Sequence, residues 1–121
     1  MSSIMLIFLI TAILFGIFAL IGRFTKLDLT KAGTILLMML LGIVICTFVN
    51  VFLKNDTLDL FVSYISIIVF LGFTAYDMQK IKMLSYEFDE EDKIAIIGAL
   101  ELYLDFINIF IDLLRIFGKR D

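Results

Sequence analysis

The sequence predicts an all-α protein of the membrane, a polytopic helical bundle, from three observations. Hydrophobic residues make up 62% of the 121 residues and charged residues only 19%, against about 45–50% and about 25% in a soluble domain. The apolar residues gather in long runs with few charges, as membrane-spanning segments do. These runs are continuous rather than alternating, which favours helices over the strands of a closed barrel.

Four apolar segments follow one another along the chain. We expect helices at about residues 4–22, 32–53, 60–84 and 94–116 of a single membrane domain, residues 1–121. Ile4–Gly22 and Ala32–Leu53 carry no charge and are long enough, at about 1.5 Å per residue, to cross a hydrocarbon core of about 30 Å. The third segment, Leu60–Tyr76, spans only if its helix continues through Asp77.

The fourth segment, Ile94–Leu114, is apolar except for a polar stripe. At about 100° per residue its polar residues fall within an arc of about 60°: Glu101, Asp105, Asn108 and Asp112. The third segment carries a weaker stripe within an arc of about 80°: Ser63, Ser66, Thr74 and Asp77. We expect the two striped helices to face each other, with Asp77 and Asp105 as the deepest acids of their segments.

The connections between segments are short and polar, and their basic residues indicate an orientation because Lys and Arg concentrate on cytoplasmic loops. If all four segments cross, the ten basic residues divide six to four between the two sides. If the fourth segment enters and leaves on one side, they divide nine to one. We therefore expect three transmembrane helices plus a half-inserted or re-entrant fourth helix, with a cytoplasmic C-terminus. Asp28 or Thr30 is available to cap the second helix.

The composition excludes several kinds of chemistry. The chain has no His and a single Cys, Cys46, so it holds no His-based triad or zinc site and no intrachain disulfide. A net charge of −3 gives no electrostatic footprint for nucleic acid. We expect no enzyme and no cofactor. Without His, the remaining catalytic possibility is an intramembrane aspartyl protease, and of the motifs that such a protease needs only Tyr76-Asp77 is present. The acidic cluster at residues 87–92 lacks the spacing of a calcium-binding EF-hand, and we expect it in a solvated loop.

The buried acids and the small residues suggest different roles. A carboxylate at the centre of a membrane helix costs about 2.5–3.5 kcal/mol on insertion scales, so such residues usually serve a function. Two close carboxylates do not both ionise at low cost and therefore share a proton. The structural alternative pairs Asp105 with Arg115 or a backbone donor, and we expect Glu101 and Asp112 near the membrane interface. Small residues spaced by four predict a close-packing face on the second helix: Gly42, Cys46 and Asn50.

Two blocks of residues carry a more specific pattern. The first is Gly72-Phe-Thr-Ala-Tyr-Asp77-Met-Gln-Lys-Ile81, and the second is Gly98-Ala-Leu-Glu-Leu-Tyr-Leu-Asp105-Phe-Ile-Asn108-Ile-Phe, followed by Leu-Leu-Arg115. Together they resemble the C-terminal signature of the Bax inhibitor-1 family, the transmembrane Bax inhibitor motif proteins. The resemblance implies a fold of seven helices, the last enclosed by the other six, of which these four segments would match the fourth to seventh.

The resemblance also implies a function and a site. It implies that Asp77 and Asp105 form a pH-sensing pair that controls a calcium leak, in which calcium is the permeant ion and the pair its contact residues. The other polar positions of the two blocks would support them: Gln79, Glu101, Asn108 and Arg115. An arginine of an early helix, which is thought to bind the pair in the closed state of family members, has no counterpart in this chain.

Other readings of the same resemblance stay open. One is that the chain is a fragment that lacks an N-terminal half, and another is that it needs a partner chain. Family members are also described as modulators of cell death or of membrane proteolysis, so the alternative is a non-transporting regulator that binds other membrane proteins. An inactive truncated remnant is the third possibility. We expect an integral membrane protein in the lipid bilayer, located in the cell membrane if the source is bacterial.

Overall fold

The chain folds into four α-helices. The structure, a computed structural model, describes residues 3–87 and 91–120. The helices are α1 (Ser3–Phe24), α2 (Thr30–Leu53), α3 (Asp56–Glu87) and α4 (Glu91–Arg120). All four are long enough and apolar enough to cross a membrane, and the described residues include no strand. The predicted all-α membrane bundle is confirmed, and α3 does continue through Asp77.

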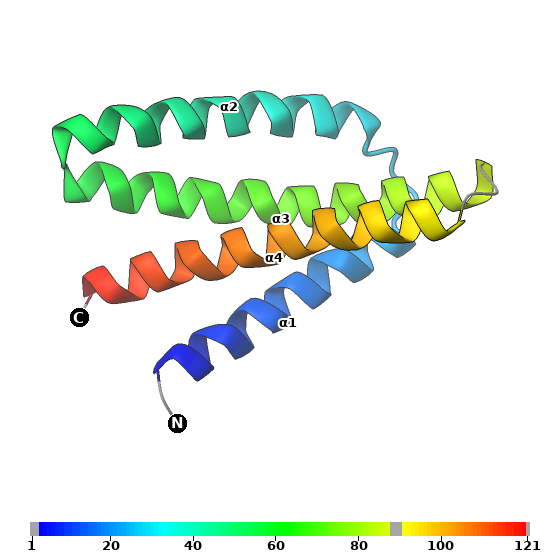
Figure 1. Cartoon of the computed structure of the whole chain (residues 1–121), viewed down its shortest axis with the longest axis horizontal. Helices are drawn as coiled ribbons and strands as arrows, with labels where there is room; N and C mark the ends of the chain where they lie inside the picture. The colour runs from blue at the N-terminus through cyan, green and yellow to red at the C-terminus, as the bar shows by residue number, and fades with distance from the viewer. Residues whose placement is uncertain (1–2, 88–90, 121) are drawn as a thin grey trace.

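The central helix is α3, which contacts each of the other three helices. Figure 1 shows α2 beside α3 at one side of the bundle and α1 at the other, diverging toward the N-terminus. Both termini and the α2–α3 turn lie at one end, and the α1–α2 and α3–α4 connections lie at the other (Figure 1). Within the described residues α2 packs against α3 alone, whereas α1 packs against both α3 and α4.

Apolar packing joins α1, α3 and α4. Their buried core cluster consists of Ile7, Leu71, Ile109 and Leu113. At its edge, the Phe106 ring of α4 meets Phe8 and Phe15 of α1, each edge to face with ring centroids 5.4 Å apart. Aromatic pairs in this geometry contribute about 0.5–1.5 kcal/mol beyond the area that they bury. These contacts fix α4 against α1 on the side away from α2.

The connection before α2 uses Asp28 and Thr30, the two residues expected there, although neither is the N-cap. Leu29 occupies the N-cap position. Asp28 Oδ1 accepts hydrogen bonds from the hydroxyl of Thr30, at 2.6 Å, and from its backbone N–H, at 3.0 Å. These two hydrogen bonds, the hydroxyl first, hold the pKa of the Asp28 carboxyl below its usual value. They are therefore present at neutral pH and are lost as the pH falls through that lowered pKa.

The turn between α2 and α3 is tight because side-chain amides satisfy its backbone. Lys54 adopts a left-handed conformation (φ 51°), and its N–H donates to the Asn50 carbonyl at 2.7 Å. Asn55 Oδ1 accepts from the N–H groups of Thr57 and Leu58, at 2.9 and 3.2 Å. The first free N–H groups of α3 are thus capped, so α3 begins only three residues after α2 ends.

The fourth segment differs from the re-entrant form that the charge count favoured. Helix α4 is unbroken from Glu91 to Arg120 and runs beside α3 from the α3–α4 connection to the opposite end of the bundle (Figure 1). It contains no reversal that would return it to its starting side. Of the acidic cluster before it, Asp89 and Glu90 lie outside the described residues.

The small-residue face expected on α2 is wrong. Gly42 has no neighbour that an added methyl group would meet, and Cys46 is exposed. Close packing occurs instead at Gly22, where a methyl group would overlap the backbone of Ala75, and at Gly33, where it would overlap the ring of Tyr76. Spacing alone predicted that small residues share a face, but which face meets a neighbour depends on how the helices pack.

Candidate functional site

Two aspartates from different helices meet in the interior of the bundle. Asp77 of α3 is 6% exposed and Asp105 of α4 is 5% exposed. Their carboxyl groups are close enough to interact through a side-chain hydrogen bond. A hydrogen bond between two carboxyl groups requires a proton on one of them, because an ionised carboxylate only accepts. A hydrogen bond between these two carboxyl groups would therefore share one proton.

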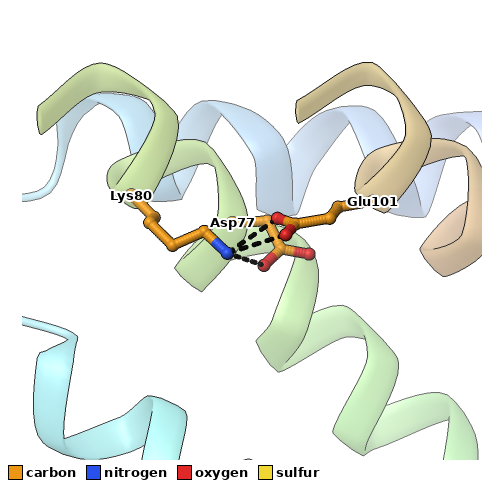
Figure 2. Close-up of polar contacts among 3 residues, drawn as sticks. All are labelled: Asp77, Lys80 and Glu101. Atoms are coloured by element: carbon orange, nitrogen blue, oxygen red, sulfur yellow. Dashed lines mark hydrogen bonds and ion pairs between the residues drawn. The ribbon is translucent and has the colours of Figure 1, made fainter. Parts of the chain in front are cut away.

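A lysine and a glutamate complete the polar cluster (Figure 2). Lys80 Nζ lies 2.9 and 2.8 Å from the two carboxylate oxygens of Glu101 and 4.0 Å from Asp77 Oδ1. The Lys80 and Glu101 side chains are about one-third exposed, at 34% and 31%. Lys80 comes one turn after Asp77 on α3, and Glu101 comes one turn before Asp105 on α4. The ion pair thus covers the carboxyl pair on the side of the α3–α4 connection.

The cluster borders a cavity of about 460 Å³ between α2 on one side and α3 and α4 on the other. Its polar lining comprises Tyr76, Asp77, Lys80, Glu101, Asp105 and Asn108. The rest of the lining is apolar apart from Gly33, and includes Leu37 and Leu40 of α2 and Phe70 of α3. The carboxyl pair thus lies beside a space large enough for water and small ions.

The charges of the cluster do not balance when every carboxyl group is ionised. Three carboxyl groups, those of Asp77, Glu101 and Asp105, lie near one cation, Lys80, which makes its close contacts with Glu101. Ionised carboxylates in a low-dielectric surrounding need protons or cations to compensate them. No group of three or more His, Cys, Asp or Glu suited to holding a metal ion occurs in the described part of the chain.

The structure brings four of the predicted residues to this cavity and places two elsewhere. Asp77, Glu101, Asp105 and Asn108 line it, and the Asn108 side-chain amide donates to the Leu104 carbonyl at 2.7 Å. Gln79 instead accepts from the Leu29 N–H at 2.8 Å and donates to the Leu27 carbonyl at 2.6 Å. It therefore clamps the α1–α2 connection onto α3. Arg115 lines a second cavity further along α4.

Lys80 was not predicted as a site residue, although its spacing was available in the sequence. A cation three residues after Asp77 shares its helix face, and Glu101 shares the stripe of Asp105. Since α3 and α4 present these faces to each other, the Lys80 cation is expected near both Asp77 and Glu101. The separation of Lys80 from Asp77 and Glu101 depends on the relative rotation of the helices, which no sequence spacing supplies.

Four helices, each long and apolar enough to cross a membrane, define the class as an integral membrane protein, and carboxyl groups are buried between two of these helices. A family model described as "Inhibitor of apoptosis-promoting Bax1" matches residues 1–121. The chain belongs to the Bax inhibitor-1 family, as its two sequence blocks indicated.

Relatives of this chain are found in several bacteria. It is 49% identical to "Inner membrane protein YbhL" of Escherichia coli (strain K12) over 124 residues, which cover 98% of this chain and 53% of that protein. Uncharacterized proteins of Borreliella burgdorferi and Rickettsia prowazekii are each 42% identical to it, with 98% of this chain and 53% and 52% of theirs covered. The chain thus spans about half the length of these relatives.

Proposed function

We propose that this chain forms a pH-sensitive calcium leak pathway, or part of one, in which Asp77 and Asp105 are the proton-sharing gate. The observation that carries the proposal is that two buried carboxyl groups from different helices lie close enough to interact, beside a cavity of about 460 Å³. Membership of the Bax inhibitor-1 family supports it, because the family resemblance implies a calcium leak. Intramembrane acids that face an interior commonly mark ion pathways.

The gate would work through the shared proton. While one carboxyl holds the proton, the Asp77–Asp105 hydrogen bond joins α3 to α4 at this level. Loss of the proton leaves two adjoining carboxylates that repel each other and attract hard cations such as calcium. Lys80 offsets only part of this negative charge, because its close contacts are with both carboxylate oxygens of Glu101. The protonation state of one pair thus sets both the helix contact and the charge of the cavity.

Calcium flux in proteoliposomes tests the gate through Asp105→Asn. An amide keeps the size of the side chain but neither loses nor gains a proton in this range. We expect the wild-type chain to carry calcium at a rate that changes between mildly acidic and mildly alkaline pH. The Asn variant should lose that pH dependence while it remains folded by circular dichroism. Asp77→Asn should behave in the same way, because the proton belongs to the pair.

Asp28→Asn is the matched control for these variants. It makes the same chemical change at an exposed acid of the α1–α2 connection, where the amide oxygen of Asn can still accept the hydrogen bonds from Thr30. Its flux should keep the wild-type pH profile. Flux that is absent from the wild-type chain, or equally pH-dependent in Asp105→Asn, would count against the gate. A membrane partner captured by both the wild-type chain and Asp77→Asn/Asp105→Asn, in the absence of flux, would favour the non-transporting regulator.

The cytoplasmic C-terminus stays a prediction. It followed from a basic-residue count of nine to one, which assumed that the fourth segment returns to its starting side. An unbroken α4 that crosses gives six to four, and such a near balance favours neither orientation strongly. The firmer expectation is that the two ends of α4 lie on opposite sides of the membrane.

A further inference from the structure

A third buried acid lies outside the Asp77–Asp105 pair. Asp112 follows Asp105 by seven residues on α4, which is about 10 Å along the helix axis. It is 6% exposed and therefore buried within the bundle. Its carboxyl interacts with the Ser66 hydroxyl of α3, so it belongs to the contact between the two polar stripes. Its Oδ2 atom is buried and has no hydrogen-bond partner among the described residues.

The Asp112 carboxyl borders a second cavity, of about 480 Å³. The polar residues in its lining are Thr47, Ser66, Asn108, Asp112 and Arg115. The two cavities adjoin, because Leu40, Phe70 and Asn108 line both of them. Helix α2 supplies one wall of each, and nowhere along the described chain does α2 pack closely against α4. The two cavities therefore form one groove between α2 and α4, with an acidic group at each of two levels.

Few charges act on Asp112. Arg115, one turn further along α4, attracts its carboxylate without a direct ion pair between the two side chains, and Asp59 of α3 repels it. From α2 the cavity receives the uncharged Thr47. Helix α1 carries no charged residue before Arg23, near its C-terminal end. A negative charge on Asp112 is thus only partly compensated where it is buried.

We propose that Asp112 is a second proton-binding carboxyl, which exchanges its proton with the groove independently of the Asp77–Asp105 pair. A proton is the ligand that fits, because one carboxyl beside neutral oxygens lacks the several carboxylates that a divalent cation prefers. The proton neutralises the buried carboxyl, whose unpartnered oxygen is otherwise costly in an apolar span. Two helical turns and the uncharged Asn108 separate Asp112 from Asp105, so the two levels titrate separately.

Labelling with dicyclohexylcarbodiimide, read by peptide mass spectrometry, tests this site without any flux measurement. The reagent reacts with protonated carboxyl groups in apolar surroundings: the acid proton passes to a carbodiimide nitrogen, and the carboxylate oxygen bonds to the central carbon. Rearrangement then leaves a stable N-acylurea that retains every atom of the reagent. We expect labelling of Asp112 at low pH that falls about tenfold per pH unit once the proton is lost, as for a single titrating group.

Three variants separate the proposal from its alternatives. Asp112→Asn should remove the adduct from the α4 peptide at this position. Asp105→Asn should leave the pH profile at Asp112 unchanged, because the two levels are independent. Arg115→Gln should keep Asp112 labelled to higher pH, because it removes the cation that favours the carboxylate.

Three results would overturn the proposal. They are an Asp112 that is unlabelled at every pH, an adduct whose yield does not change with pH, and a profile that collapses in Asp105→Asn. The calcium leak proposed above is tested separately, because the labelling experiment needs no permeant ion. A chain that carries no calcium can still show the Asp112 profile.

Discussion

At the scale of single residues, this protein buries acids that a membrane interior penalises and gives each a partner on a neighbouring helix. Asp77 and Asp105 partner each other, and Asp112 meets Ser66. Buried hydroxyls are satisfied differently, within their own helices: Ser63 and Thr74 donate to the carbonyls four residues earlier, at 2.9 and 2.8 Å. The aspartate carboxyls, together with the Lys80–Glu101 ion pair, therefore supply polar contacts between α3 and α4.

Gln79 provides a prediction at this scale. Replacement by Ala removes the hydrogen bonds to the Leu29 N–H and the Leu27 carbonyl, which lie in a largely exposed connection, at a cost of about 0.5–1.5 kcal/mol each. We expect hydrogen–deuterium exchange to accelerate across residues 25–31. Exchange in the α2–α3 turn, at the far end of α2, is the internal reference and should not change. Unchanged protection of the α1–α2 connection would show that Gln79 does not hold it.

The acids of the site were predictable from the sequence, whereas the roles of their neighbours were not. Helical spacing placed Asp77 and Asp105 on facing stripes, and the structure brings them into contact. Gln79 was expected to support the pair because it lies two residues from Asp77. Two residues are about 200° of helix turn, so its side chain points elsewhere, toward a connection whose path the sequence did not specify.

At the scale of helices, apolar runs located each helix but underestimated its length. The third segment was expected at residues 60–84 and the fourth at 94–116, whereas α3 covers Asp56–Glu87 and α4 covers Glu91–Arg120. Hydropathy marks where a helix is apolar, and polar turns at its ends remain helical because their backbone bonds continue. The Asn55 cap in the α2–α3 turn shows this, since it begins α3 among polar residues.

Gly22 provides a prediction at the scale of helix packing. A methyl group added there would overlap the Ala75 backbone, its Cα at 2.6 Å included, and a backbone cannot move aside as a flexible side chain does. Gly22→Ala should therefore separate α1 from α3 and cost about 1–3 kcal/mol, as overpacking does. The measurement is the thermal unfolding midpoint in detergent micelles.

Gly16→Ala is the matched control, because it makes the same change on α1 where an added methyl group meets no atom. Its unfolding midpoint should equal or exceed that of the wild type, since Ala favours helix over Gly by about 1 kcal/mol. Equal midpoints for the two variants would contradict the close approach of α1 and α3 at Gly22.

At the scale of the whole molecule, α4 determines the topology. It runs unbroken beside α3, so its two ends are separated by the full length of the bundle. The charge count pointed to a re-entrant segment because it registers only the residues at the ends of segments. The packing of α4 against α1 and α3 is a property of its apolar faces, which the count does not include.

Cysteine accessibility tests this topology in a Cys46→Ser background, which removes the one native thiol. Single cysteines at Leu27, in the α1–α2 connection, and at Gly118, near the end of α4, report the two ends of the bundle. We expect a membrane-impermeant maleimide to label one of them, and not the other, in intact cells. Whichever is labelled, the pattern identifies the side of the C-terminus. Labelling of both, with wild-type expression levels, would mean that α4 does not cross.

Helix α2 is attached to the rest of the bundle through one neighbouring helix. It packs only on α3 within the described residues, and its two ends are fixed, by the Gln79 clamp at one and by the Asn50–Asn55 turn at the other. A tilt or bow of α2 between these fixed ends changes the width of the groove without disturbing the α1–α3–α4 core. Because α2 lines both cavities, such a movement would change the access of water to all three buried aspartates at once.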